Sequence, residues 1–206
     1  MAPQTQPLNK RILLSRPLED SKRIAPDFER LGYAVVISPV LHIKQLDVTL
    51  PEHDIICLSS KNALPALKNI SKKTPIFCVG HYTQQCLRVL GFQNITHATT
   101  AQKLLPQLAQ QSGKVLYLAG EVATLDFSAH LPQCQKLICY EAIAVDTLKK
   151  EISHTSITHI PFYSLRSAQL LHKLLIKNKL DLKGITALAL STDIANAIKD
   201  FDFKEI

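Results

Sequence analysis

Short apolar runs rich in branched residues alternate along the chain with amphipathic stretches of helical periodicity, and this alternation constrains the fold most. The runs predict strands at Arg11–Ser15, Tyr33–Ser38, Asp54–Leu58, Pro75–Val79, Lys114–Leu118, Leu137–Val145, Ile157–Phe162 and Ile185–Leu190. The stretches predict helices at Glu19–Leu31, Asn62–Ile70, Tyr82–Leu90, Ala101–Gln110, Ser167–Lys177 and Asp193–Asp200. Such alternation with short connections predicts an α/β fold, with parallel sheets flanked by helices.

Two segments interrupt this alternation and suggest how the chain is divided. Ser38–Lys44 and Leu137–Val145 are extended in pattern, and each is flanked by strand or loop where a helix is expected. Two such segments suit a chain that leaves one lobe, builds a second lobe and then returns. We therefore predict two Rossmann- or flavodoxin-like lobes joined by a two-stranded hinge. The first lobe comprises residues 1–38 and 146–206, the second lobe residues 46–137, and the linker residues 39–45 and 138–145.

Composition narrows the classes of ligand. Glycine accounts for 6 of 206 residues, and no two glycines lie closer than seven positions apart. This spacing excludes the glycine-rich turn of a dinucleotide site and the phosphate-binding loop of nucleotide hydrolases. The formal charge is +7, but the basic residues are dispersed and no nucleic-acid module is recognisable. We therefore expect no nucleic-acid partner and interpret the surplus charge as suited to an anionic small molecule.

Membrane and metal sites are not indicated either. The longest apolar run, Val115 to Ala119, is far too short to span a bilayer. The first ten residues lack the apolar segment of a signal peptide, so we expect a cytoplasmic protein. The histidines show no metal-binding spacing, and we expect no metal and no cofactor. The cysteines form no C-x-x-C pair and are expected to be buried, reduced thiols: Cys57, Cys78, Cys86, Cys134 and Cys139.

Polar residues gather where predicted strands end and the next helices begin. They are Ser15, Arg16, Ser59, Ser60, Lys61, Asn62, Gly80, Thr83, Ser164, Arg166, Ser167, Ser191 and Thr192. In an open α/β sheet the ligand lies outside the carboxyl ends of the strands, and helix N-termini there favour anions. For a single residue, helix capping worth about 1 kcal/mol is the simpler interpretation. The whole set, together with the positive charge, predicts an anion-binding rim.

Tyr140 lies within the second extended segment, where a hinge residue faces both lobes. One interpretation is a functional role for its hydroxyl. The other is a ring that packs on the sheet with its hydroxyl in water. Position alone leaves both open. The sequence contains no G-x-S-x-G turn and no carboxylate pair at strand ends, so nothing in it indicates a hydrolase.

Taken in order, these turns resemble the uroporphyrinogen-III synthase family over nearly the whole chain. Ser15-Arg16-Pro17 is similar to the Thr/Ser-Arg-Pro that ends the family's first strand, and the strand after Gly32 leads to Pro39. The other similar segments are Ser59–Ala63 (Thr-Ser-x-Asn-Ala in the family), Val79–Thr83 (Val-Gly-x-x-Thr), Val115–Gly120, Tyr140-Glu141 in the linker, and Phe162–Ala168. Gln84, Ala119 and Ile194 depart from the family pattern and put single contacts in doubt.

The resemblance implies an enzyme of tetrapyrrole (haem) biosynthesis, a hydro-lyase. It cyclises hydroxymethylbilane, a linear tetrapyrrole polycarboxylate, to uroporphyrinogen III with loss of water and inversion of ring D, without a cofactor. On this hypothesis Tyr140 donates a hydrogen bond to the departing hydroxyl. Substrate binding falls to Ser15, Arg16, Ser59, Ser60, Lys61, Asn62, Gly80, Thr83, Ser164, Arg166 and Ser167. We expect a monomer. The alternative is a non-catalytic, hinged two-lobe binding protein for a polyanionic small molecule.

Overall fold

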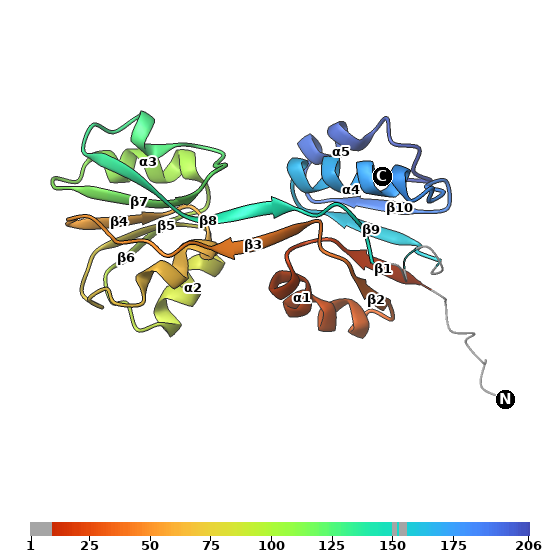
Figure 1. Cartoon of the computed structure of the whole chain (residues 1–206), viewed down its shortest axis with the longest axis horizontal. Coiled ribbons are helices and arrows are strands. Elements are labelled where there is room, and N and C mark those ends of the chain that lie inside the picture. The colour runs from red at the N-terminus through yellow and green to blue at the C-terminus, as the bar shows by residue number, and fades with distance from the viewer. Residues whose placement is uncertain (1–9, 150–151, 153–155) are drawn as a thin grey trace. The chain divides into compact units, whose positions relative to one another are not determined.

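The computed structural model describes residues 10–149, 152 and 156–206, which form two compact units (Figure 1). The first unit takes its described residues from 10–42 and 143–206, and the second consists of residues 43–142. Residues 1–9, 150–151 and 153–155, which the sequence assigned to the first lobe, lie outside the described residues. No helix among the described residues is long and apolar enough to cross a membrane.

The first unit is built on a four-stranded parallel sheet with the order β10-β9-β1-β2. Its strands are β1 (Arg11–Leu14), β2 (Ala34–Ile37), β9 (His159–Phe162) and β10 (Thr186–Ala189). Its helices are α1 (Leu18–Arg30), α4 (Leu165–Lys177) and α5 (Thr192–Ile198). Ile12, Leu14 and Phe162 are almost completely buried, because helices cover the sheet.

The second unit contains a six-stranded sheet with the order β3-β8-β7-β4-β5-β6. Its strands are β3 (Leu41–Gln45), β4 (Ile55–Leu58), β5 (Ile76–Val79), β6 (Ile95–Ala98), β7 (Val115–Gly120) and β8 (Cys134–Ala144). Its helices are the 3₁₀ helix η1 (Lys61–Leu67), α2 (His81–Val89), α3 (Ala101–Ala109) and the short η2 (Phe127–Ala129). Ile55 of β4 packs into one core cluster and Ile56 into another. Both faces of the sheet are therefore buried, which explains the continuously apolar strands.

The strands β3 and β8 carry the chain between the two units. The amide of Leu46 donates to the Cys139 carbonyl at 3.0 Å, and the amide of Val145 donates to the Val40 carbonyl at 3.1 Å. The two strands therefore run in opposite directions. The division between units falls after His42 in β3 and after Ala142 in β8. That these strands act as a hinge remains a prediction.

The predicted α/β class, with two parallel sheets flanked by helices, is confirmed, but two local predictions were wrong. Asn62–Ile70 was expected to be an α-helix, whereas the chain forms a 3₁₀ helix there. Pro65 lies inside it and has no amide hydrogen for an α-helical bond, but Pro26 lies inside α1 and Pro106 lies inside α3, so the proline alone does not explain the 3₁₀ form. The edge strand β6 was not predicted at all. The exposed His97 interrupts its apolar pattern.

Candidate functional site

At the carboxyl edge of the second unit's sheet, two strand ends turn directly into helices. Ser60 follows β4 in an extended conformation, and its hydroxyl accepts from the amide of Asn62 at 3.2 Å to cap η1. Gly80 follows β5 with a φ of 86°, a conformation that favours glycine, and opens α2. Ser60 is therefore a helix cap, as the simpler interpretation of the sequence predicted.

Tyr140 lies on β8 opposite Gly120 at the end of β7, where the register shifts. A Cβ built on Gly120 is 2.6 Å from Cε2 and 2.7 Å from Cζ of Tyr140, so glycine is what makes room for the ring. The tyrosine is only 7% exposed. Burial raises the pKa of Tyr140, opposed by hydrogen bonding to Ser60 and to the Gly120 backbone. The hydroxyl therefore stays protonated at neutral pH and can donate.

A cavity of about 400 Å³ opens beside Tyr140. It brings together three of the predicted residues, Ser59, Ser60 and Tyr140. Its other lining residues are Val79, Thr100, Ala101, Gln102, Val122, Ala123, Thr124 and Leu125. Lys61, Asn62, Gly80 and Thr83 do not line it, and the side chain of Thr83 is buried within α2.

Sequence reasoning missed Thr100, Gln102 and the loop from Val122 to Leu125. Thr100 caps α3, accepting from the amide of Lys103 at 3.3 Å. A polar pair, Thr99-Thr100, directly before the predicted helix Ala101–Gln110 was the available signal. It was overlooked because the strand that precedes it, β6, had not been recognised.

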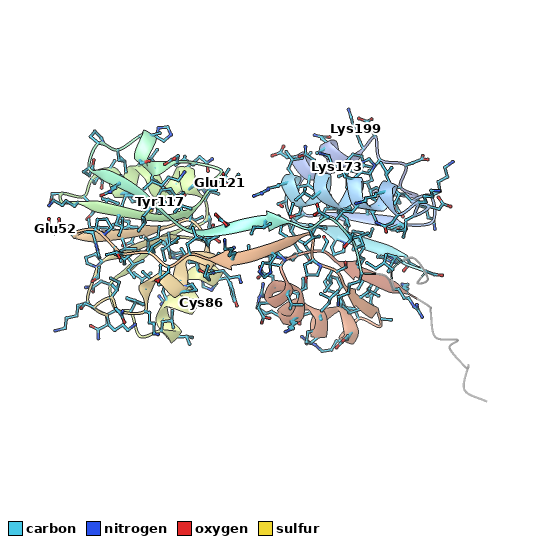
Figure 2. All side chains as sticks on the ribbon, viewed as in Figure 1. Glu52, Cys86, Tyr117, Glu121, Lys173 and Lys199 are labelled. Carbon is cyan, nitrogen blue, oxygen red and sulfur yellow. The ribbon has the colours of Figure 1, made fainter. Side chains whose placement is uncertain are left out.

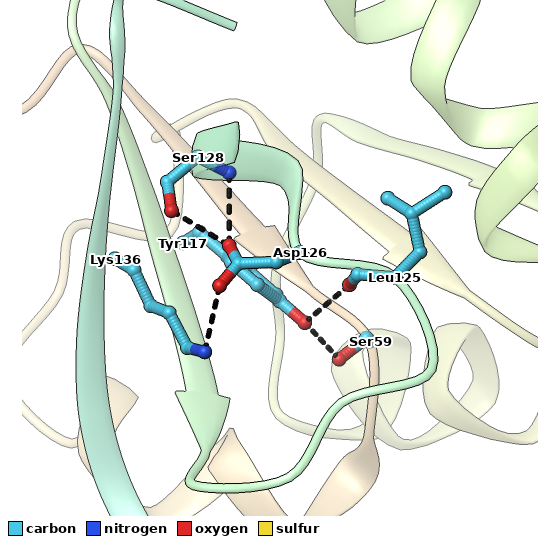
Figure 3. A network of polar contacts seen from close by, with 6 residues as sticks. All are labelled: Ser59, Tyr117, Leu125, Asp126, Ser128 and Lys136. Atoms are coloured by element: carbon cyan, nitrogen blue, oxygen red, sulfur yellow. Dashed lines mark hydrogen bonds and ion pairs between the residues drawn. The ribbon is translucent and has the colours of Figure 1, made fainter. Parts of the chain in front are cut away.

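A network of polar contacts fixes one wall of this cavity (Figure 3). The Tyr117 hydroxyl lies 2.7 Å from the Ser59 hydroxyl and 3.3 Å from the carbonyl of Leu125. Next along the chain, Asp126 accepts from the Ser128 amide at 3.1 Å and from Lys136 at 2.8 Å. These hydrogen bonds lower the pKa of Asp126.

The predicted residues of the first unit lie at the carboxyl ends of β1 and β9. Arg16 follows β1, and its guanidinium lies over the Tyr163 ring at 4.6 Å and 3.7 Å from Asp20. Burial raises the pKa of Tyr163, and Arg16 opposes that rise. Ser15, directly before Arg16, is buried.

The other first-unit residues, Ser164, Arg166 and Ser167, open α4. The Ser164 hydroxyl caps the helix, accepting from the amide of Ser167 at 3.2 Å. It also donates to the Ser167 hydroxyl at 2.9 Å. The first unit therefore presents a capped helix N-terminus and an aromatic-stacked arginine at its own sheet edge.

These groups suit an organic anion. Hydroxyls and helix N-termini offer neutral donors, arginine offers a charged one, and Tyr140 holds a proton. Within the described ranges, no three histidine, cysteine or acidic side chains gather in a way that could hold a metal ion. The fold and site thus define a two-unit α/β protein with polar sites at the carboxyl edges of its sheets.

Comparison with known proteins makes this class specific. The family model described as "Uroporphyrinogen-III synthase HemD" matches residues 22–206. The chain belongs to the uroporphyrinogen-III synthase family, hydro-lyases of tetrapyrrole biosynthesis. No individual curated protein matches at a significant level.

Two solved structures share the fold. The crystal structure of uroporphyrinogen-III synthetase from Helicobacter pylori superposes with a TM-score of 0.66 at 17% identity, covering 94% of this chain and 89% of that chain. A mutant uroporphyrinogen III synthase from Thermus thermophilus gives 0.55 at 16% identity, covering 94% and 90%. The predicted family, enzyme class and two-lobe fold are thereby confirmed.

Proposed function

We propose that this chain cyclises hydroxymethylbilane at the sheet edges described above, with Tyr140 as the group that assists loss of the terminal hydroxyl. The observation that carries the proposal is the position of Tyr140. It is a buried tyrosine that keeps its proton, lines a cavity and is held beside Ser60 at the end of a parallel sheet. A protonated phenol in that setting can donate to a departing oxygen.

The reaction begins when the C–O bond to the terminal hydroxyl breaks while the Tyr140 phenol gives its proton to the departing oxygen, which leaves as water. The lone pair of the pyrrole nitrogen drives this step. The cation left behind is attacked by the substituted carbon of the last pyrrole, which gives a spiro intermediate. Fragmentation and reclosure yield the inverted ring, and the proton that this ring then loses returns to the Tyr140 phenolate. Most of the chemistry lies in the substrate, so the protein mainly folds it and prevents direct closure.

Substrate carboxylates are held, in this proposal, by helix N-termini and basic groups of both units. The first unit contributes Ser15, Arg16, Ser164, Arg166 and Ser167, and the second unit contributes Ser60, Lys61, Asn62, Gly80 and Thr83. Support comes from the capped helix starts at Ser60 and Ser164 and from the stacked guanidinium of Arg16. Since backbone amides supply many of the donors, single side-chain changes in this set weaken activity without abolishing it.

We further propose that the two lobes close on the substrate by bending at the linker. The first lobe is residues 1–38 with 146–206, the second lobe is residues 46–137, and the linker is residues 39–45 and 138–145. Small-angle scattering with and without product tests this closure, and an unchanged profile contradicts it. In the same proposal the enzyme is a cytoplasmic monomer that binds no nucleic acid. Size-exclusion chromatography with light scattering tests the monomer, since a monomer gives a mass near 22.9 kDa.

The central experiment supplies freshly made hydroxymethylbilane to the purified protein and separates the type I and type III products. The expected product is type III, and formation of type I alone, as in spontaneous closure, refutes the function. Tyr140→Phe should lower kcat by about 100-fold, the lower end of the range for general acid catalysis. Tyr33→Phe removes a phenol that packs against Phe28 and His159 in the first unit and serves as the matched control. Full turnover by Tyr140→Phe contradicts the donor role.

A further inference from the structure

Tyr117 connects two walls of the cavity without lining it. Its ring is completely buried on β7 and packs edge-on against Phe127, with the ring centroids 5.0 Å apart. Its hydroxyl reaches Ser59, at the end of β4, and the carbonyl of Leu125, at the end of the opposite wall. Figure 3 shows this hydroxyl between the two segments. The same oxygen atom therefore contacts both walls, and these two contacts fix the distance between Ser59 and Leu125.

The direction of these hydrogen bonds follows from a count of protons. A carbonyl oxygen can only accept, so the single hydroxyl proton of Tyr117 is donated to Leu125. The 2.7 Å contact with Ser59 then requires Ser59 to donate to Tyr117. With its proton so used, Ser59 presents only lone pairs to the cavity. A substrate carboxylate needs donors, so Ser59 is poorly suited to bind one.

The loop that forms the second wall is anchored at both ends. It begins after Gly120, which is packed against the Tyr140 ring, and it ends at Asp126, which is bonded to Lys136 of β8. Between these points, the hydrogen bond from Tyr117 ties Leu125 to the β4 turn. Burial raises the pKa of Tyr117 to about 12, so the hydroxyl keeps its proton at neutral pH and remains a donor.

We propose that Tyr117 is a positioning residue for the cyclisation, which acts through Ser59 and Leu125 to set the width of the cavity beside Tyr140. This inference rests on the proposed function, in which that cavity holds the reacting end of the bilane. Ser59 belongs to this positioning pair and is not a carboxylate ligand. When the pair is broken, the walls separate and the last ring is held less firmly, so direct closure competes with inversion.

The test uses the full chain in excess over hydroxymethylbilane in a single turnover, so that spontaneous closure of free substrate is negligible. The fraction of type I product then reports closure without inversion on the enzyme. This fraction is insensitive to a partial loss of folded protein, which a purely structural role would cause. Tyr117→Phe removes only the hydroxyl and keeps the ring against Phe127. The companion variants are Ser59→Ala, which breaks one of the two bonds, and Ser59→Thr, which keeps a hydroxyl.

Tyr117→Phe should lower kcat by about tenfold, with KM changed less than about twofold, and should raise the type I fraction. Ser59→Ala should also lower kcat and raise the type I fraction, but less strongly. Ser59→Thr, which keeps a hydroxyl, should give the wild-type product ratio. The double variant should be no worse than Tyr117→Phe, because both changes break the same bond. Tyr33→Phe is the control.

Wild-type kcat and product ratio in Tyr117→Phe overturn the proposal, and so do fully additive effects in the double variant. If Tyr117→Phe does not fold, the comparison of Ser59→Ala with Ser59→Thr decides, and an unchanged type I fraction in Ser59→Ala overturns the proposal. Failure of the wild-type protein to make type III is a different outcome. It refutes the proposed function itself.

Discussion

The close contact between Gly120 and Tyr140 makes Gly120→Ala a sharp test of the catalytic role of Tyr140. A Cβ on Gly120 is 2.6 Å from Cε2, 2.7 Å from Cζ and 3.0 Å from the hydroxyl oxygen of the tyrosine. Carbon atoms in contact normally lie about 3.5–4.0 Å apart. The ring must therefore move by about 1 Å. Gly120 does not have a positive φ, so the substitution adds no backbone strain and its effect is purely steric.

The tyrosine can move away from the added Cβ only against its packed neighbours or into the cavity that it lines. It is buried in a cluster that includes Leu58, Leu118 and Cys139, so a shift of the ring disturbs the packing around it. Overpacking of this kind costs about 1–3 kcal/mol of unfolding free energy. Displacement by about 1 Å of a group that acts on the substrate can cost on the order of 100-fold in rate. We therefore expect kcat to fall by about 100-fold, together with a moderate loss of stability.

The assay measures kcat, KM and the thermal midpoint of Gly120→Ala beside those of Gly184→Ala. Gly184 is the matched control because nothing lies within 4 Å of its added Cβ and its φ is also not positive. On the Tyr140→Phe background, Gly120→Ala should reduce kcat little further, since the group it displaces is already absent. Wild-type kcat in a folded Gly120→Ala variant refutes the reasoning. So does a full additional loss of rate on the Tyr140→Phe background.

Two further predictions concern thiols and acid stability. A maleimide should modify Cys86 rapidly in the native protein, because that thiol is partly exposed on α2 (Figure 2), and peptide mass spectrometry should find slow modification of the others. Burial raises the pKa of each of these: Cys57, Cys78 (to about 12), Cys134 (to about 11) and Cys139 (to about 11). Rapid modification of any of them contradicts the burial. Asp126→Asn should be less stable than wild type to urea at pH 7, because hydrogen bonds from Lys136 and Ser128 lower the pKa of Asp126. A carboxyl pKa that is lowered in the folded state adds stability above the pKa of the unfolded state, which is about 4. The difference in unfolding free energy between wild type and Asp126→Asn should therefore narrow below about pH 4. A difference that stays constant with pH contradicts this prediction.

The fold class was accessible from the sequence because parallel sheets impose a strong local pattern. Buried strands must be apolar on both faces, as at Ile55–Leu58, and the helices between them must be amphipathic. Local pattern failed where polar residues interrupted it or where it could not distinguish one kind of helix from another. The edge strand Ile95–Ala98 is too polar to stand out, and the pattern over Lys61–Leu67 did not distinguish a 3₁₀ helix from an α-helix.

The site was only partly accessible, for a different reason. Carboxyl ends of parallel strands meet at one edge, and that rule led us to expect a site at the strand-end turn with Ser59 and Ser60, which line the cavity. The rule gives no sheet order and no register. The contact between Ser59 and Tyr117 joins residues 58 positions apart, which become neighbours because β4 pairs with β7. The approach of Tyr140 to Gly120 depends on a register shift between β7 and β8.

The cavity's lack of charge also has a physical explanation in the proposed mechanism. None of its lining residues, all of which lie in the described part of the chain, is acidic or basic, although the protein carries a formal charge of +7. The mechanism forms a cation at the end of the bilane. A lysine or arginine about 4 Å from that cation would oppose it by about 4 kcal/mol at an effective dielectric constant of about 20. That repulsion corresponds to roughly a thousandfold in rate. Neutral hydroxyls and amides can bind the carboxylates of the substrate without this penalty, so basic residues are best placed away from the reacting ring.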